Sequence, residues 1–272
     1  MAGPELTVDV SANPRVEVFF DAGELDGDTA RLRMYRFSEN RTWLVRGGVD
    51  VVPGSAALDF EVPFNTVATY RAEMFDGAGQ SLGFTDTSST EVEYEGTVVH
   101  QPLAPSLWAH MTVLDGSGAS LVRPTAGELV GVEGAVPARW IGTRRRGLVD
   151  TLVSLGASTV EDADRFQFML SSYTTQQLGI LCIRTSDGIR WPRTFFARGE
   201  FAEIDWDVRL GGEYIVFEAA STEVEPPFPG ITTPLLSYSD MSEAFSTYTA
   251  LAAAIPTYTQ SARSYEYAGL AG

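Results

Sequence analysis

Apolar and polar residues alternate in short runs over the first part of the chain. A period of two is typical of strands that bury one face. Turn-forming pairs such as Asp26-Gly27 and Asp76-Gly77 separate the runs. The pattern predicts roughly seven antiparallel strands, and therefore an immunoglobulin-like or fibronectin-like β-sandwich over residues 1–100. Its apolar runs lie at residues 6–10, 16–20, 32–34, 58–62, 70–74 and 92–94.

A different order of elements follows residue 100. Two prolines in Gln101-Pro-Leu-Ala-Pro105 interrupt the alternation, which places a linker or domain edge there. Residues 148–155 then have strand character, and Ser158-Thr-Val-Glu161 has the spacing of a helix capping box. Strand, helix and several further strands thus predict a second domain over residues 101–230. Helical periodicity lies at Ala163, Phe166, Leu170 and Tyr173, and strand-like composition at residues 178–185, 194–208 and 213–225.

A ten-residue repeat fills the end of the chain, residues 231–272. Tyr238, Tyr248 and Tyr258 recur in it, each followed by Ser or Thr. Within a repeat the apolar residues fall at i, i+3 and i+7, which is one face of a helix, and Ser239 or Thr249 occupies the expected N-cap position. The repeat therefore predicts a C-terminal arm of short helices.

Helices of two turns are marginal alone, and Pro256 disfavours one continuous helix. We therefore expect the arm to be ordered only against another surface. Its aromatic and apolar residues either cap the core of the same chain or dock on a neighbouring subunit. The candidate docking residues are Tyr238, Met241, Phe245, Tyr248, Leu251, Ile255 and Tyr258.

Charge and cysteine content narrow the possible functions. The 272-residue chain has a net charge of −17, and all 19 of its basic residues are arginine. Such acidity argues against a surface that binds nucleic acid, but it suits a surface that nucleic acid passes without binding.

The single cysteine, Cys182, excludes an intrachain disulfide and is expected to be a buried small hydrophobe rather than a reactive thiol. No apolar run approaches a membrane span of about 18 residues, and the N-terminus does not resemble a signal peptide, so folding in a cytoplasm is expected.

Three carboxylates alternate with apolar residues at Glu203, Asp205 and Asp207, so a strand would place them on one face. Clustered carboxylates can bind a cation or share a proton. A straight strand spaces them about 6–7 Å apart and does not fold around an ion. A solvent-facing or channel-facing acidic strand is therefore favoured, and no metal site is predicted.

Signatures of catalysis are missing from the sequence. The two histidines, His100 and His110, lie outside metal-ligand spacing, and no nucleophile-elbow or phosphate-binding motif occurs. A retaining glycosidase could use paired Glu and Asp, but nothing fixes a pair. We therefore predict no catalytic residue, no cofactor and no enzyme activity. The basic run Arg144-Arg-Arg146 is expected to pair with carboxylates of its own or an adjoining subunit rather than with nucleic acid.

Three motifs stand in the N-terminal half: Val45-Arg-Gly-Gly48, Asp59-Phe-Glu-Val-Pro-Phe64 and Thr69-Tyr-Arg-Ala-Glu73. The prolines Pro102 and Pro105 follow them. In this order the motifs resemble those of minor tail proteins of long, non-contractile-tailed (siphovirus-type) bacteriophages of actinobacteria.

Motifs in the second half are similar to the split-barrel domain of distal tail proteins and tail-tube subunits. The tyrosine arm also resembles that group, although its usual Trp and Asp positions are mostly Tyr, Ala or Thr here. The barrel motifs are Arg144-Arg-Arg-Gly147, Glu161-Asp-Ala-Asp164, residues 178–187 and Glu223-Val-Glu-Pro-Pro227.

This resemblance implies a split β-barrel in a virion protein that is assembled in the host cytoplasm. It implies a homo-oligomer, commonly a six-copy ring, that joins the tail tube to the host-contacting tip. Expected partners are the tail-tube, tape-measure and tail-hub proteins and other minor tail proteins. DNA would pass through the ring without specific binding, past Glu203, Asp205 and Asp207, and no membrane insertion is implied. The alternative is a carbohydrate-binding adhesin in which Trp43, Trp108 or Trp191 stacks on host glycans.

Overall fold

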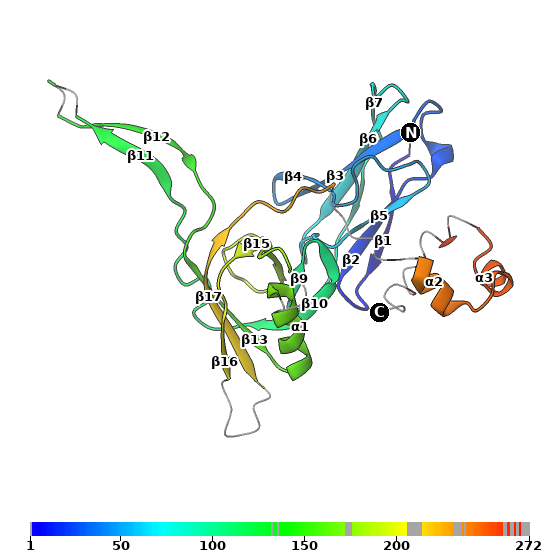
Figure 1. The fold of residues 1–272 in the computed structure, drawn as a ribbon. Coiled ribbons are helices and arrows are strands. Elements are labelled where there is room, and N and C mark those ends of the chain that lie inside the picture. Colours follow the sequence, from blue (N-terminus) through cyan, green and yellow to red (C-terminus); the bar gives the residue numbers. More distant parts are fainter. Residues whose placement is uncertain are drawn as a thin grey trace.

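The computed structural model of the chain is mainly β, with a sandwich, a closed barrel and a helical arm (Figure 1). The predicted fold class is confirmed. The structure describes residues 2–131, 133–134, 136–171, 176–205, 214–230, 236, 238–257, 260–261, 264 and 267.

The N-terminal unit is a sandwich of two antiparallel sheets. Leu32 and Met34 of one strand lie opposite Met74 and Ala72 of the next, and all four are buried. Val18 from the other sheet joins the same core, so the alternation of apolar residues confirms the predicted sandwich. One sheet contains β1 (Glu5–Asp9), β2 (Arg15–Phe19) and β5 (Ala56–Asp59); the other contains β3 (Arg31–Ser38), β4 (Arg41–Leu44), β6 (Ala68–Phe75), β7 (Ser81–Phe84) and β8 (Ser88–Thr90). A 3-10 turn, η1 (Ala22–Glu24), follows β2.

The second unit is a six-stranded barrel, because β13 pairs with β17 and closes the strand order β13-β10-β9-β14-β15-β17. Val99, Ile183, Phe195 and Phe217 are buried together in its core. Strand β16 pairs with β17 beyond the closed ring. The strands are β9 (Thr97–Gln101), β10 (Ala104–Val113), β13 (Thr151–Ala157), β14 (Leu181–Thr185), β15 (Thr194–Arg198), β16 (Ala202–Asp205) and β17 (Ile215–Glu223).

Helix α1 (Val160–Leu170) packs into this core through Phe166, whose ring lies 4.4 Å from that of Phe217 between centroids. The predicted helix is confirmed, but its cap begins one residue later than expected. Thr159, in extended conformation, accepts a hydrogen bond from the backbone N–H of Asp162, so the capping pair is not Ser158 and Glu161. Ala163 and Phe166 are buried as predicted, Leu170 is half-buried, and Tyr173 lies outside the described residues.

The linker expected at residues 101–105 is instead the turn between β9 and β10. Gln101 pairs with Ala104, so Pro102 is the first residue of a two-residue turn, a position that accommodates the fixed φ of proline. Pro105 lies in an irregular stretch of β10, between Ala104 and Trp108, where the ladder register shifts. The chain passes from sandwich to barrel earlier, between β8 and β9.

Two further elements extend from these units. Strands β11 (Thr125–Val130) and β12 (Arg139–Arg145) form a two-stranded ribbon that projects away from the barrel (Figure 1). The arm contains α2 (Tyr238–Ala244) and α3 (Tyr248–Ala254), as the repeat predicts. Thr247 rather than Thr249 caps α3, because its hydroxyl accepts a hydrogen bond from the N–H of Ala250. Thr257 accepts one from the N–H of Gln260 in the same way, so in these two repeats the cap is the threonine before the tyrosine.

Candidate functional site

Arg184 of β14 holds the barrel against the sandwich. Its side chain is fully buried and donates to the backbone oxygens of Pro14 at 2.7 Å and Val62 at 3.3 Å, and to the side-chain oxygen of Asn13. The guanidinium carbon also lies 4.6 Å from the centre of the Phe64 ring. Burial lowers the pKa of Arg184 to about 10, so the group is still protonated at neutral pH. The contact therefore places a buried cation between the two units.

A second connection runs from β17 back to the sandwich along residues 224–230, here called the strap. Arg46 of the sandwich bonds Glu61 at 2.6 Å and donates to the backbone oxygens of Pro227 and Phe228. Burial raises the pKa of Glu61, and Arg46 offsets part of that rise. Together with Arg184, these contacts fix how the two units lie relative to each other.

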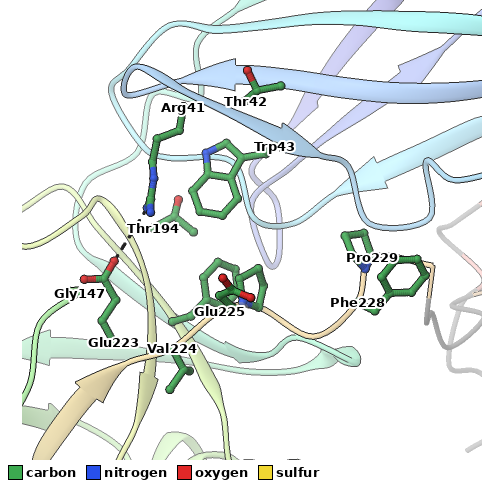
Figure 2. A pocket seen from close by; sticks show the side chains of 12 residues that line it. Arg41, Thr42, Trp43, Gly147, Thr194, Glu223, Val224, Glu225, Phe228 and Pro229 are labelled. Atoms are coloured by element: carbon green, nitrogen blue, oxygen red, sulfur yellow. Dashed lines mark ion pairs between the residues drawn. The ribbon is translucent and has the colours of Figure 1, made fainter. Parts of the chain in front are cut away.

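A cleft of about 640 Å³ opens beside the strap, between β4 and the barrel (Figure 2). Arg41 reaches across it toward Glu223, with 3.9 Å between the closest nitrogen and oxygen. Trp43 points into the cleft, and Phe228 lies at its other end. The lining thus combines an aromatic ring, a guanidinium and carboxylates, which suits a polar ligand better than an apolar one.

The three tryptophans that could stack on host glycans, Trp43, Trp108 and Trp191, lie in three different environments. Trp191 is buried and stacked on Phe195, so it belongs to the barrel core. Trp108 is partly buried and packs edge-on against His110 at 4.8 Å. Trp43 alone of the three lines the cleft, but the Arg41 guanidinium lies 4.9 Å from its ring centre. A sugar could stack on Trp43 only if it displaced that contact.

Two of the three predicted carboxylates, Glu203 and Asp205, are exposed on β16. Glu203 accepts a hydrogen bond from Gln167 of α1, so its carboxylate lies beside the helix rather than inside the barrel. Asp207 lies outside the described residues. Whether these groups line a channel between copies stays a prediction.

The β11–β12 ribbon exposes an apolar cluster that the sequence did not reveal. Leu129, Trp140 and Ile141 are 70%, 50% and 56% exposed. An isolated two-stranded ribbon is marginally stable in water, and exposed apolar clusters typically mark interaction surfaces. The available signal was two short runs, residues 125–130 and 139–145, that each contain an adjacent apolar pair and are separated by residues that include Gly131, Gly134 and Pro137.

The basic run lies at the end of this ribbon. Within the described part of the chain, no ion pair joins Arg144, Arg145 or Arg146 to a carboxylate. Arg145 donates instead to the backbone oxygen of Arg123, which lies in the segment that leads into β11. The predicted pairing with carboxylates of the same chain is therefore not formed among the described residues, and pairing with another subunit stays a prediction.

The arm brings some of its predicted docking residues together and leaves others exposed. Tyr238 and Tyr248 are 69% and 73% exposed, and their hydroxyls are hydrogen-bonded to each other at 2.9 Å. Met241 is buried, and the Phe245 ring packs against Tyr267. Leu251 and Ile255 are half-buried, and Tyr258 lies outside the described residues.

His100 and Cys182 are cross-strand partners buried where the barrel meets the sandwich. Cys182 is buried, as predicted, and burial raises the pKa of its thiol, which disfavours the reactive thiolate. Burial, together with Arg184 and Arg46, lowers the pKa of His100 well below its usual 6.5. Both ring nitrogens are without a hydrogen-bond partner among the described residues.

This histidine predicts a pH-dependent stability. Below pH 6.5 the unfolded chain takes up a proton that the folded His100 does not, so stability is complete above pH 6.5 and declines as the pH falls. Between pH 7.5 and 5.5 the loss is about 1.4 kcal/mol. Denaturant titrations of the wild type and His100→Leu at pH 7.5 and 5.5 measure it, and the variant should lack this component. His110→Gln changes the only other histidine, which is exposed, and should keep it. Equal pH dependence in wild type and His100→Leu would contradict the prediction.

Among the described residues, no group of three or more His, Cys, Asp or Glu side chains is placed to hold a metal ion. In that same part of the chain, no helix is both long and apolar enough to span a membrane. No family model, curated protein or solved structure matches this chain.

Proposed function

We propose that this protein is a structural subunit of a bacteriophage tail tip. In this role it forms a ring around the DNA channel and joins the tail tube to the proteins that contact the host. The observation that carries the proposal is the β11–β12 ribbon, which projects from a closed barrel with Leu129, Trp140 and Ile141 exposed. A monomer would leave these apolar side chains in water, whereas an assembly could bury them between subunits.

The charge of the chain supports the same role. A net charge of −17 repels a phosphate backbone, so DNA could pass close to the subunits without binding. Exposed Glu203 and Asp205 on β16 remain the candidate channel-lining groups, together with Asp207. Proposed partners are other copies of the chain, the tail-tube, tape-measure and tail-hub proteins and other minor tail proteins, and the proposed location is the virion. The role requires neither catalysis nor a cofactor.

A carbohydrate-binding adhesin is the competing proposal. The cleft beside the strap favours it, because Trp43 and Arg41 together could hold a polar ring. Binding to host glycans that Trp43→Ala abolishes, in a variant that still folds, would support this reading over the structural one.

Native mass spectrometry of the purified chain tests the assembly. A six-copy ring would have a mass of 6 × 29.5 = 177 kDa. A closed oligomer supports the structural role. A single copy at every concentration would contradict it.

Deletion of residues 237–272 tests the proposed function of the arm. We expect the truncated chain to assemble more weakly than the full chain while keeping the same β signal in circular dichroism. The physical reason is that α2 and α3 present exposed Tyr238 and Tyr248, which an adjacent subunit could cover. Sedimentation velocity measures the assembly of both chains at equal concentrations. Unchanged assembly after the deletion would reject the bracing role.

A further inference from the structure

Charge is unevenly divided between the ribbon and the rest of the chain. Residues 123–146, which comprise the ribbon and its two stems, contain five arginines and two glutamates, a net charge of +3. Because the whole chain carries −17, the remaining residues carry −20. The ribbon is therefore a basic element that projects from a strongly acidic body (Figure 1).

The ribbon also presents a preformed aromatic anchor. Trp140 lies opposite Leu129, and its indole covers the neighbouring pair Gly127 and Gly142. A Cβ atom on Gly127 would come within 2.5 Å of the indole, and one on Gly142 within 2.6 Å, so only glycine leaves room for the ring. One face of the indole thus rests on the ribbon while half of the side chain remains exposed. Tryptophan held in this way loses little conformational entropy on binding, and Trp and Arg are the residues most enriched at binding hot spots.

Both faces of the ribbon combine apolar and basic side chains. Along the regular part of β12, Trp140 lies on one face, whereas Arg139 and Ile141 share the other. The ladder register shifts between Gly142 and Arg145, so Arg145, which pairs with Thr125, falls on the same face as Trp140. Every residue of β12 is exposed, so this sheet has no partner on either face within the described structure. Burial of such a surface would require a partner that is both acidic and able to cover apolar groups.

We propose that the ribbon of one copy docks on the acidic body of a second copy of this chain. The inference rests on the proposed function, since it names the contact through which copies assemble. Charge complementarity selects this partner: a ribbon of +3 meets a body of −20. The body offers exposed carboxylates on fixed segments, such as Glu91, Glu93 and Glu95 before β9 and Glu161 at the start of α1. Nucleic acid is disfavoured, because the same −20 body would approach the phosphate backbone together with the ribbon.

Two ribbon variants of the full chain test the contact. Trp140→Ala removes the anchor, and Arg144→Glu/Arg145→Glu reverses the charge. Because these residues are exposed and remote from both cores, melting temperatures should match the wild type. We expect each variant to weaken self-association by about tenfold or more in sedimentation equilibrium. The wild-type association should weaken with added salt, and the charge variant should be less sensitive to salt. Arg31→Glu/Arg198→Glu makes the same change in net charge at exposed positions outside the ribbon and should associate as wild type does.

A photo-cross-linking amino acid in place of Glu128, an exposed ribbon residue that is neither the anchor nor one of the arginines, identifies what the ribbon touches. In a mixture of nitrogen-14 and nitrogen-15 copies, we expect cross-links between the ribbon of one isotope and body peptides of the other. An oligomer that survives both ribbon variants without such cross-links would overturn this inference and leave the proposed ring intact. A monomer under all conditions would overturn both. Binding of duplex DNA that is lost in the charge variant, with self-association unchanged, would assign the ribbon to nucleic acid and also overturn the inference.

Discussion

Replacement of Asp59 by alanine is expected to lower the free energy of unfolding by about 3–5 kcal/mol, because it leaves a buried arginine without its counterion. Asp59 and Arg36 are each 1% exposed and form an ion pair inside the sandwich. Tyr70 donates its hydroxyl hydrogen to the same carboxylate at 2.9 Å, and the backbone N–H of Glu61 bonds the other oxygen. One carboxylate therefore satisfies three buried donors.

The pKa directions agree with this description. Burial alone would lower the pKa of Arg36, and the attraction of Asp59 outweighs it, so the pKa is raised. Burial and the Asp59 charge both raise the pKa of Tyr70, which keeps the phenol protonated as a donor. Arg36 is consequently charged in the folded state at all pH values of interest, and loss of Asp59 cannot be relieved by deprotonation.

Three comparison variants separate the ion pair from simple packing. Asp59→Asn keeps the shape but loses the charge and should still be strongly destabilising. Arg36→Met/Asp59→Leu removes both charges and should recover part of the lost stability, because the Tyr70 hydroxyl and the Glu61 N–H still lose their acceptor. Arg31→Ala breaks the exposed pair with Asp50, whose closest atoms are 3.9 Å apart, and should cost at most about 1 kcal/mol. Denaturant titration measures all of them. If Asp59→Ala lowered the free energy of unfolding by less than Arg31→Ala does, the proposed role of the buried ion pair would be contradicted.

The fold could be predicted from the sequence wherever alternation reports on one buried face. Runs such as Leu32 to Met34 and Tyr70 to Met74 show this, because every second side chain enters the sandwich core. The barrel strand that contains Cys182 and Arg184 is buried on both faces. Its residues therefore do not alternate between apolar and polar, and the sequence does not indicate which face points into the barrel. Prolines were misleading at residues 101–105, since a hairpin turn and an irregular strand tolerate them as well as a linker does.

The candidate sites were harder to predict, because they depend on residues far apart in the chain. Asn13, Val62 and Arg184 come together from three segments, and no local motif signals their contact. The ribbon was missed for a different reason. Its strands are exposed on both faces, so the apolar residues Leu129, Trp140 and Ile141 do not form the one-sided pattern of a core strand.

The buried cation between sandwich and barrel leads to the second large effect. Arg184→Met is expected to lower the free energy of unfolding by about 3 kcal/mol, because Pro14 and Val62 would each lose a hydrogen-bond donor in a buried interface. We also expect amide hydrogens in residues 13–16 and 62–64 to exchange faster, while those of the β3–β6 pair are unchanged, since the sandwich keeps its own core. Hydrogen–deuterium exchange read by mass spectrometry distinguishes a loosened interface from general unfolding.

Arg184→Lys is the matched control, because it keeps the positive charge but not the planar fork of donors. A lysine ammonium could not reach the side-chain oxygen of Asn13 and both backbone oxygens in the same geometry, so this variant should recover only part of the loss. Full recovery by lysine would mean that charge alone, and not the fork, holds the two units together. Unchanged stability and exchange in Arg184→Met would show that the strap contacts of Arg46 with Pro227 and Phe228 suffice to fix the barrel on the sandwich.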